Sequence, residues 1–348
     1  MDKPTLEARV RNGENISSLD ATNSVLRGAD LGGAIIESST FRGATLAGAR
    51  LAESVISQCD FTGADLTGAD LRHAVFDRCD LSGAKLTESQ CSEVKFHECK
   101  LVKSQLAGLD LRVTVFSKCD LSGASLARAS CGTTSFIEIN AESLDLSGVS
   151  LQKSVFFKVD LSTVSFAGAR FELGIFHDCV LSALDLSGLD LSHSQFMGCD
   201  LVNANLERAT LTKCNFRGAN LGLANLKRAS ATNALFIGAQ LRRATLRGAK
   251  LHQSLFVEAD LRRVNLTDAD LRQCVFHKAN CNGARFMGAD LSEADLSYAD
   301  LTGSDFTNAS LRRARFHGSN VTDCVGRAPG WIGDDESLAA AERALPHT

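Results

Sequence analysis

Twelve cysteines and eight histidines are the side chains of this 348-residue sequence that could hold a metal ion or act as nucleophiles. A zinc site needs three or four such ligands together, often with two histidines close in sequence. No histidine pair here has that spacing. Six cysteines, Cys59, Cys79 and Cys99 among them, recur at multiples of 20 residues, and all twelve fall at positions that the repeat described below turns inward. We therefore interpret them as small apolar packing residues in a reduced compartment.

No catalytic signature accompanies these residues. The sequence has no glycine-rich phosphate loop at a strand–helix junction and no pair of carboxylates in an identifiable cleft. Aspartate recurs directly before an apolar position, for example at Asp60 and Asp80. We interpret it as turn chemistry, because Asp side chains accept hydrogen bonds from nearby backbone amides. An acidic stripe resembling a DNA backbone is the alternative. We expect no enzyme activity, no cofactor and no metal.

The pattern that must position all these side chains is a repeat of five residues. It is clear in FTGADLTGADLRHAVFDRCDLSGAKL (61–86), where every fifth residue, here called a centre, is apolar and the residue two before it is small. Centres fall at every fifth residue from 16 to 321, which makes 62 consecutive pentapeptides without an insertion. A helix would scatter these centres over all its faces, and a flat strand would alternate them between two faces. A chain that turns a corner every five residues keeps them all inside.

A second period, four pentapeptides long, indicates four sides per coil. Phenylalanine occupies eleven centres at this spacing, namely Phe76, Phe96, Phe116, Phe136, Phe156, Phe176, Phe196, Phe216, Phe236, Phe256 and Phe276. The neighbouring columns of centres are mainly leucine. The sequence therefore predicts an all-β solenoid whose interior is filled by side chains and holds no pocket.

The units ADLTGADL (64–71) and GANLGLANL (218–226) carry a recognisable signature: Ala, then Asp or Asn, then Leu or Phe, then any two residues. In this the chain resembles the pentapeptide-repeat proteins. The resemblance implies a right-handed quadrilateral β-helix, here with about 15 coils of 20 residues that rise roughly 4.8 Å each. We expect an N-terminal cap over 1–15, the β-helix over 16–321, and a C-terminal loop and short helix over 322–348.

Both ends of the sequence predict short helical caps. Residues 4–14 (PTLEARVRNGE) form a candidate helix over the first coil. Near the other end, Asp334 or Asp335 can begin a helix that runs to about Leu345. Trp331, Leu338 and Leu345 are the candidate contacts of this segment, either as a cap or between two copies of the chain.

Charge is distributed unevenly around a mild net −4. Residues 1–200 carry a net −8, and residues 201–300 a net +5. In the basic section the repeat stacks like charges one coil apart, which repel modestly. The candidate partner-binding face consists of Arg242, Arg243, Arg262, Arg263, Lys227 and Arg247. The alternative interpretation is a solvated face, with nearby carboxylates such as Asp260 and Asp268 neutralising it internally.

These features favour a rigid, non-catalytic rod that binds a protein partner through its outer faces. The mild net charge argues against direct nucleic-acid binding. The sequence shows no apolar leader and no run of 18 apolar residues, so we expect a cytoplasmic protein without a membrane span, with export by a signal-independent route left open.

The family resemblance adds two sharper alternatives for this bacterial-type repeat. One is a DNA-mimicking protein that protects the topoisomerase gyrase, from which the positive section departs. The other is an accessory, effector-loading protein of type VI secretion whose partners are spike components.

Overall fold

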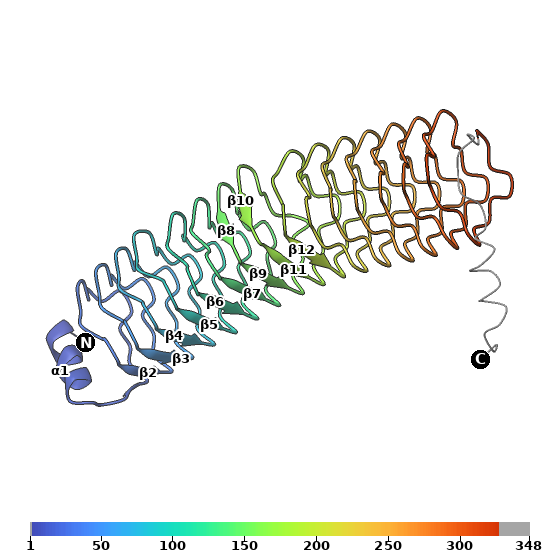
Figure 1. Cartoon of the computed structure of the whole chain (residues 1–348). Helices are drawn as coiled ribbons and strands as arrows, with labels where there is room; N and C mark the ends of the chain where they lie inside the picture. The colour runs from blue at the N-terminus through green and yellow to red at the C-terminus, as the bar shows by residue number, and fades with distance from the viewer. Residues whose placement is uncertain (1, 327–348) are drawn as a thin grey trace, which may run out of the picture. The chain divides into compact units, whose positions relative to one another are not determined.

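The computed structural model describes residues 2–326 and divides into two compact units, residues 1–180 (unit 1) and 181–348 (unit 2). Trp331, Leu338 and Leu345 lie outside the described residues. The elements, labelled in Figure 1, are α1 (Lys3–Arg11), β1 (Ile16–Ser17), β2 (Ile35–Glu37), β3 (Val55–Ser57), β4 (Val75–Asp77), β5 (Lys95–His97), β6 (Val115–Ser117), β7 (Ser135–Ile137), β8 (Ser150–Gln152), β9 (Val155–Phe157), β10 (Arg170–Glu172), β11 (Ile175–His177) and β12 (Gln195–Met197).

Helix α1 packs against the first coil of unit 1. Asp2 caps the helix by accepting a hydrogen bond from the Thr5 amide at 3.0 Å, and Leu6 is fully buried. The first coil has no preceding coil to accept its backbone amides. The Glu7 carboxylate supplies one such acceptor, at 2.9 Å from the Asp30 amide nitrogen. The helix therefore satisfies part of the open edge that a β-solenoid would otherwise expose.

The strands of unit 1 stack in parallel, each in register with the strand one coil later. Nine of them, β1 to β7, β9 and β11, form one side, with Phe76 beside Phe96 and Phe96 beside Phe116. A neighbouring side holds the pair β8 and β10, in which Leu151 lies beside Phe171. Single parallel bridges, such as Asp60 with Asp80, complete the other sides at the same spacing. This architecture confirms the predicted β-solenoid.

Unit 2 repeats the same register, mostly through single bridges. All four sides are represented in its first coils, by Asp185 with Asn205, Asp190 with Thr210, Gln195 with Asn215, and Asp200 with Asn220. The series ends at Asp305 with Val325. Each outward residue therefore has, as its neighbour in the next coil, the residue 20 positions later.

The core is a column of stacked rings surrounded by leucine. In unit 1 the rings of Phe96 and Phe116 are 5.1 Å apart with 6° between their planes, and in unit 2 those of Phe236 and Phe256 are 4.8 Å apart with 3° between their planes. The predicted phenylalanine column is thus confirmed in both units. A few of the described residues depart from the pattern, among them Phe171 and His317. The centre Phe171 is only half-buried, and His317, at an outward position of the repeat, is 6% exposed and packs against the Tyr298 ring.

Each corner is a tight turn whose second residue has a positive φ. In the turn after Phe61, Gly63 has φ 64° and the Ala64 amide donates to the Phe61 carbonyl at 2.9 Å, as in a type II turn. Glycine suits this position best. Arg243 and Arg263 nevertheless occupy it in unit 2, with φ of 59° and 56°. Both side chains are exposed at the corner.

Candidate protein-interaction surface

Four of the six predicted basic residues meet at one corner of unit 2. Arg242 and Arg243 follow the buried centre Leu241, and Arg262 and Arg263 occupy the same turn one coil later. The Arg243 amide donates to the Arg262 carbonyl at 3.0 Å, which fixes the two turns on top of each other. The 20-residue register therefore brings these four guanidinium groups to one place, as the sequence predicts.

The other two residues, Lys227 and Arg247, lie at the next corner. The Arg228 amide donates to the Arg247 carbonyl at 2.9 Å, so this corner also continues from coil to coil. Between the two corners the chain presents Asn225, Thr245 and Asn265, which are joined by parallel bridges. We call this side of unit 2, with its two flanking corners, the basic side.

Carboxylates neutralise only part of the basic side. Arg262 donates to Asp260 in its own turn, with Nε 2.8 Å from Oδ1. This hydrogen bond lowers the pKa of Asp260 and raises that of Arg262, so the pair stays ionised. Lys227 lies 3.9 Å from Glu207, and Arg247 lies 3.5 Å from Asp268.

The remaining cations lack such a partner. Arg242, Arg243 and Arg263 form no ion pair within residues 2–326. Because these three guanidinium groups are exposed at a corner, they are available to an external carboxylate. The internal neutralisation that the sequence left as an alternative therefore acts through ion pairs at three of the six residues, and the charge of Arg242 also contributes to the lowered pKa of Asp260.

Two further residues of the surface were not singled out from the sequence. Leu223 is 51% exposed, and its amide donates to the Arg242 carbonyl at 3.0 Å. It therefore occupies the same corner position as Arg243, one coil earlier. Arg228 is exposed beside Lys227. A leucine two residues after a centre, where glycine and polar residues predominate, was the available sequence signal for the first.

A stretch of unit 2 without acidic residues contains part of the basic side, whereas Arg262 and Arg263 lie beyond it, after Glu258 and Asp260. Between Glu207 and Glu258 the sequence contains nine basic and no acidic side chains. They are Arg208, Lys213, Arg217, Lys227, Arg228, Arg242, Arg243, Arg247 and Lys250. Because unlike charges are absent over about two and a half coils, the local potential is positive although the whole chain carries a net −4.

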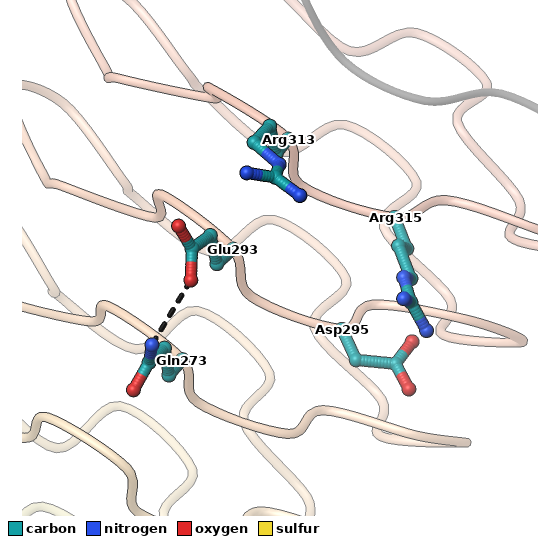
Figure 2. A pocket seen from close by; sticks show the side chains of 5 residues that line it. All are labelled: Gln273, Glu293, Asp295, Arg313 and Arg315. Atoms are coloured by element: carbon teal, nitrogen blue, oxygen red, sulfur yellow. Dashed lines mark hydrogen bonds between the residues drawn. The ribbon is translucent and has the colours of Figure 1, made fainter.

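A second surface feature of unit 2 is a shallow recess of about 320 Å³ lined by Gln273, Glu293, Asp295, Arg313 and Arg315 (Figure 2). The Gln273 amide donates to the Glu293 carboxylate at 2.9 Å, and this bond lowers the pKa of Glu293, helped by the nearby arginines. The lining mixes both signs of charge and contains no thiol, hydroxyl or imidazole. Its open shape does not exclude water.

The next feature is the set of buried cysteine thiols and the possible metal ligands. Eleven of the twelve cysteines are buried, and burial raises the pKa of Cys91, Cys131 and Cys214 to about 12, so their thiols stay protonated at neutral pH. Thiols in this form are poor nucleophiles and poor metal ligands. Residues 2–326 contain no group of three or more His, Cys, Asp or Glu placed to hold a metal ion. Within the same range, no helix has the length and hydropathy of a membrane span.

The recurring aspartates serve the turns. The Asp60 carboxylate accepts a hydrogen bond from the Thr62 amide at 2.8 Å, and Asp80 and Asp120 accept from Ser82 and Ser122 at 2.9 and 3.0 Å. The turn interpretation of this column is therefore confirmed. The predicted C-terminal contacts Trp331, Leu338 and Leu345 lie outside the described residues and stay predictions.

Comparison with solved structures finds chains that this one is similar to. HetL, a pentapeptide repeat protein involved in heterocyst differentiation regulation from the cyanobacterium Nostoc sp. strain PCC 7120, is 23% identical over 82% of this chain and 97% of its own, with a TM-score of 0.24. Full-length QnrB1, a plasmid-mediated fluoroquinolone resistance protein, is 20% identical over 58% of this chain and 98% of its own, with a TM-score of 0.24. At these values neither similarity carries an argument about function. No curated protein matches the chain.

Family comparison covers both units. The family described as pentapeptide repeat region matches residues 30–106, 49–126 and 209–286, and the one described as pentapeptide repeats (8 copies) matches residues 175–212 and 289–325. These matches span more than half of the sequence, and the 20-residue register of the backbone agrees with them. The chain belongs to the pentapeptide-repeat protein family.

Proposed function

We propose that this protein is a non-catalytic, rigid scaffold that binds an acidic protein partner through the basic side of unit 2. The observation that carries the proposal is the set of three arginines, Arg242, Arg243 and Arg263, that share one corner and have no ion pair among the described residues. Exposed guanidinium groups are well suited to bind carboxylates in pairs of parallel hydrogen bonds.

Rigidity supports this role. Hydrogen bonds between consecutive coils fix the backbone on both sides of each corner, as between Leu241 and Asp260 at 2.7 Å and between Arg243 and Arg262 at 3.0 Å. The turns therefore do not need to become ordered when a partner arrives. A pre-formed surface loses less conformational entropy on binding than a loop does. The filled interior agrees with a role in binding rather than in catalysis.

The partner is more consistent with a protein than with a nucleic acid. The basic side extends over only a few coils, and the outward column that runs along it has Asp185 before it and Asp305 after it in unit 2. A long polyanion would meet these carboxylates, whereas a compact protein segment would not. The electrostatic contribution acts mainly on the rate of association and on partner choice.

Capture from an extract of the host cell tests the proposal. The test variant carries Arg242→Glu, Arg243→Glu, Arg262→Glu and Arg263→Glu. The matched control reverses four basic residues that occupy positive-φ corner positions in unit 1, namely Lys103, Lys118, Arg128 and Lys153. Both variants change the net charge equally. We expect the test variant to lose the partner and the control variant to retain it. The melting temperatures of both variants should be unchanged. Equal capture by the two variants would refute the basic side as the binding site.

The identity of the captured protein also decides between the two sharper hypotheses. Recovery of gyrase subunits would favour topoisomerase protection, and recovery of secretion-spike components would favour effector loading. Neither hypothesis is favoured by a contact among the described residues, so the general proposal of an acidic protein partner is the one we advance.

A further inference from the structure

We infer that the segment bound by the basic side is an acidic α-helix that lies along it, parallel to the direction in which the coils stack. This inference rests on the proposed function and specifies the shape and charge pattern of the partner. It follows from the spacing of the cations, from the width of the side between its two corners, and from one exposed apolar residue in the same row.

The spacing along the stack fits a helix. Equivalent residues of consecutive coils are about 4.8 Å apart, and successive turns of an α-helix rise about 5.4 Å. Over two coil steps the mismatch is about 1 Å, which flexible arginine side chains can absorb. Alternate side chains of an extended strand rise about 6.6 Å, so an extended segment would be out of register by nearly 4 Å over the same distance. Carboxylates at i, i+4 and i+7 of a helix can therefore face Arg243, Arg263 and their neighbours in successive coils.

The arrangement across the basic side fits the same occupant. Cations stand on both corners, with Arg243 and Arg263 on one and Lys227, Arg228 and Arg247 on the other. Between them, Asn225 and Asn265 use their side-chain oxygens to accept hydrogen bonds from the turn that follows. The floor is thus polar but uncharged. A helix resting on it would turn its acidic stripe toward the row of Arg243 and Arg263, with the second row of cations along its other flank.

Leu223 adds an apolar contact at one end of the row. It is 51% exposed and occupies the same corner position as Arg243, one coil earlier. Met287, 38% exposed, follows Arg247 two coils later in the row on the opposite corner. A partner helix that combines an acidic stripe with an apolar residue one or two turns away would cover both charge and exposed leucine. A nucleic acid would gain nothing from Leu223, and the described residues of these corners offer no aromatic side chain for base stacking.

The test uses synthetic helical peptides and fluorescence anisotropy at low salt. One alanine-based peptide carries Glu at i, i+4, i+7 and i+11 and Leu one turn before the first Glu. A second peptide has the same composition with its Glu residues distributed around the helix. We expect the patterned peptide to bind at least about tenfold more tightly, and the difference to shrink as salt is raised. Comparable binding of the two peptides would overturn the inference.

Variants of the protein locate the contact. The double variant Arg243→Glu, Arg263→Glu should bind the patterned peptide about tenfold or more less tightly, as expected when two exposed charge pairs become repulsive. The control variant Lys103→Glu, Arg128→Glu should leave the affinity for the patterned peptide unchanged. Leu223→Ser should lower that affinity several-fold. No effect of the Arg243 and Arg263 reversal, or tighter binding of a single-stranded oligonucleotide of equal charge, would also overturn the inference.

The outcomes for the inference and for the proposed function are separable. If the host partner is captured through the basic side but the patterned peptide shows no preference over its isomer, the proposed function stands and the helical partner does not. If charge reversal leaves the capture of the host partner unchanged, the proposed function falls even where the peptide binds.

Discussion

Replacing one ring in the phenylalanine column of unit 2 should cost more stability than any comparable change on the surface. Phe236 is fully buried, and its ring lies 5.0 Å from that of Phe216 and 4.8 Å from that of Phe256. Phe236→Ala removes a large buried side chain and leaves a cavity between two coils that the backbone ladder holds in place. We therefore expect a loss of stability, because the neighbouring coils cannot move together to fill the cavity.

The expected loss of unfolding free energy follows from the burial of the Phe236 side chain and from its stacking on two neighbouring rings. Truncation of a buried phenylalanine to alanine typically costs about 3–5 kcal/mol of unfolding free energy. Phe236→Leu should cost less, about 1–3 kcal/mol, because leucine refills most of the volume and only the two stacked pairs, worth about 0.5–1.5 kcal/mol each, are lost. Leucine is accommodated in this column, since Leu296 occupies it and is fully buried. The neighbouring outward residue provides the control, because Ile237→Ala removes a side chain of similar character that is only half-buried.

Urea unfolding followed by far-ultraviolet circular dichroism measures these differences. With a denaturant dependence near 3 kcal/mol per molar, Phe236→Ala should lower the transition midpoint by about 1 M or more. The order of destabilisation should be Phe236→Ala, then Phe236→Leu, then Ile237→Ala. If Phe236→Ala costs no more than Ile237→Ala, the ring column does not stabilise the solenoid as we describe.

Three further predictions concern the turns, the thiols and the first coil. Hydrogen bonds from Arg72, Arg112, Arg262 and Arg272 lower the pKa of Asp70, Asp110, Asp260 and Asp270, so the stabilisation from these carboxylates is present above about pH 4 and is lost as the pH falls through the lowered values. Asp→Asn at these four positions should therefore flatten the fall in unfolding free energy below about pH 4, and an unchanged slope would contradict this account. Because burial raises the pKa of Cys91, Cys131 and Cys214 to about 12, these thiols should resist a thiol-specific reagent in the native chain and react on unfolding, whereas rapid native labelling would show that they are accessible. Glu7→Ala should speed hydrogen exchange at the Asp30 amide, while Glu53→Ala, at an exposed corner, should leave that amide unchanged.

The sequence predicted most of the fold because two periods acted on the same residues. The five-residue period placed Leu241 and Leu261 inside and Arg242 and Arg243 in a turn. The 20-residue period then stacked that turn on the one containing Arg262 and Arg263. Nothing more than the period and the identity of the centres was needed, because each coil contacts only its neighbours.

Side-chain pairing could not be predicted in the same way. Arg262 bonds Asp260 within its own turn, whereas Arg247 contacts Asp268 on the diagonal of the next coil. Asp260 stands two residues before Arg262, whereas Thr245 holds that position before Arg247, so the repeat indicates the first pair and leaves the diagonal one to side-chain torsions. The burial of His317 has a similar origin, because it depends on the single tyrosine of the chain, Tyr298, one coil earlier. Local exceptions of this kind set which cations remain available to a partner.

We propose that the 20-residue coil brings the cations of unit 2 together into one side that binds the partner. Deleting residues 251–255 tests it most directly. The deletion removes one pentapeptide, so every centre still points inward, but Arg262 and Arg263 move to another corner and no longer stack on Arg242 and Arg243. Deleting residues 266–285 is the control, because it removes one whole coil and leaves the four arginines together. We predict cooperative melting of both proteins, with capture of the partner lost only in the five-residue deletion. Capture retained by the five-residue deletion, or lost equally in both, would contradict the account.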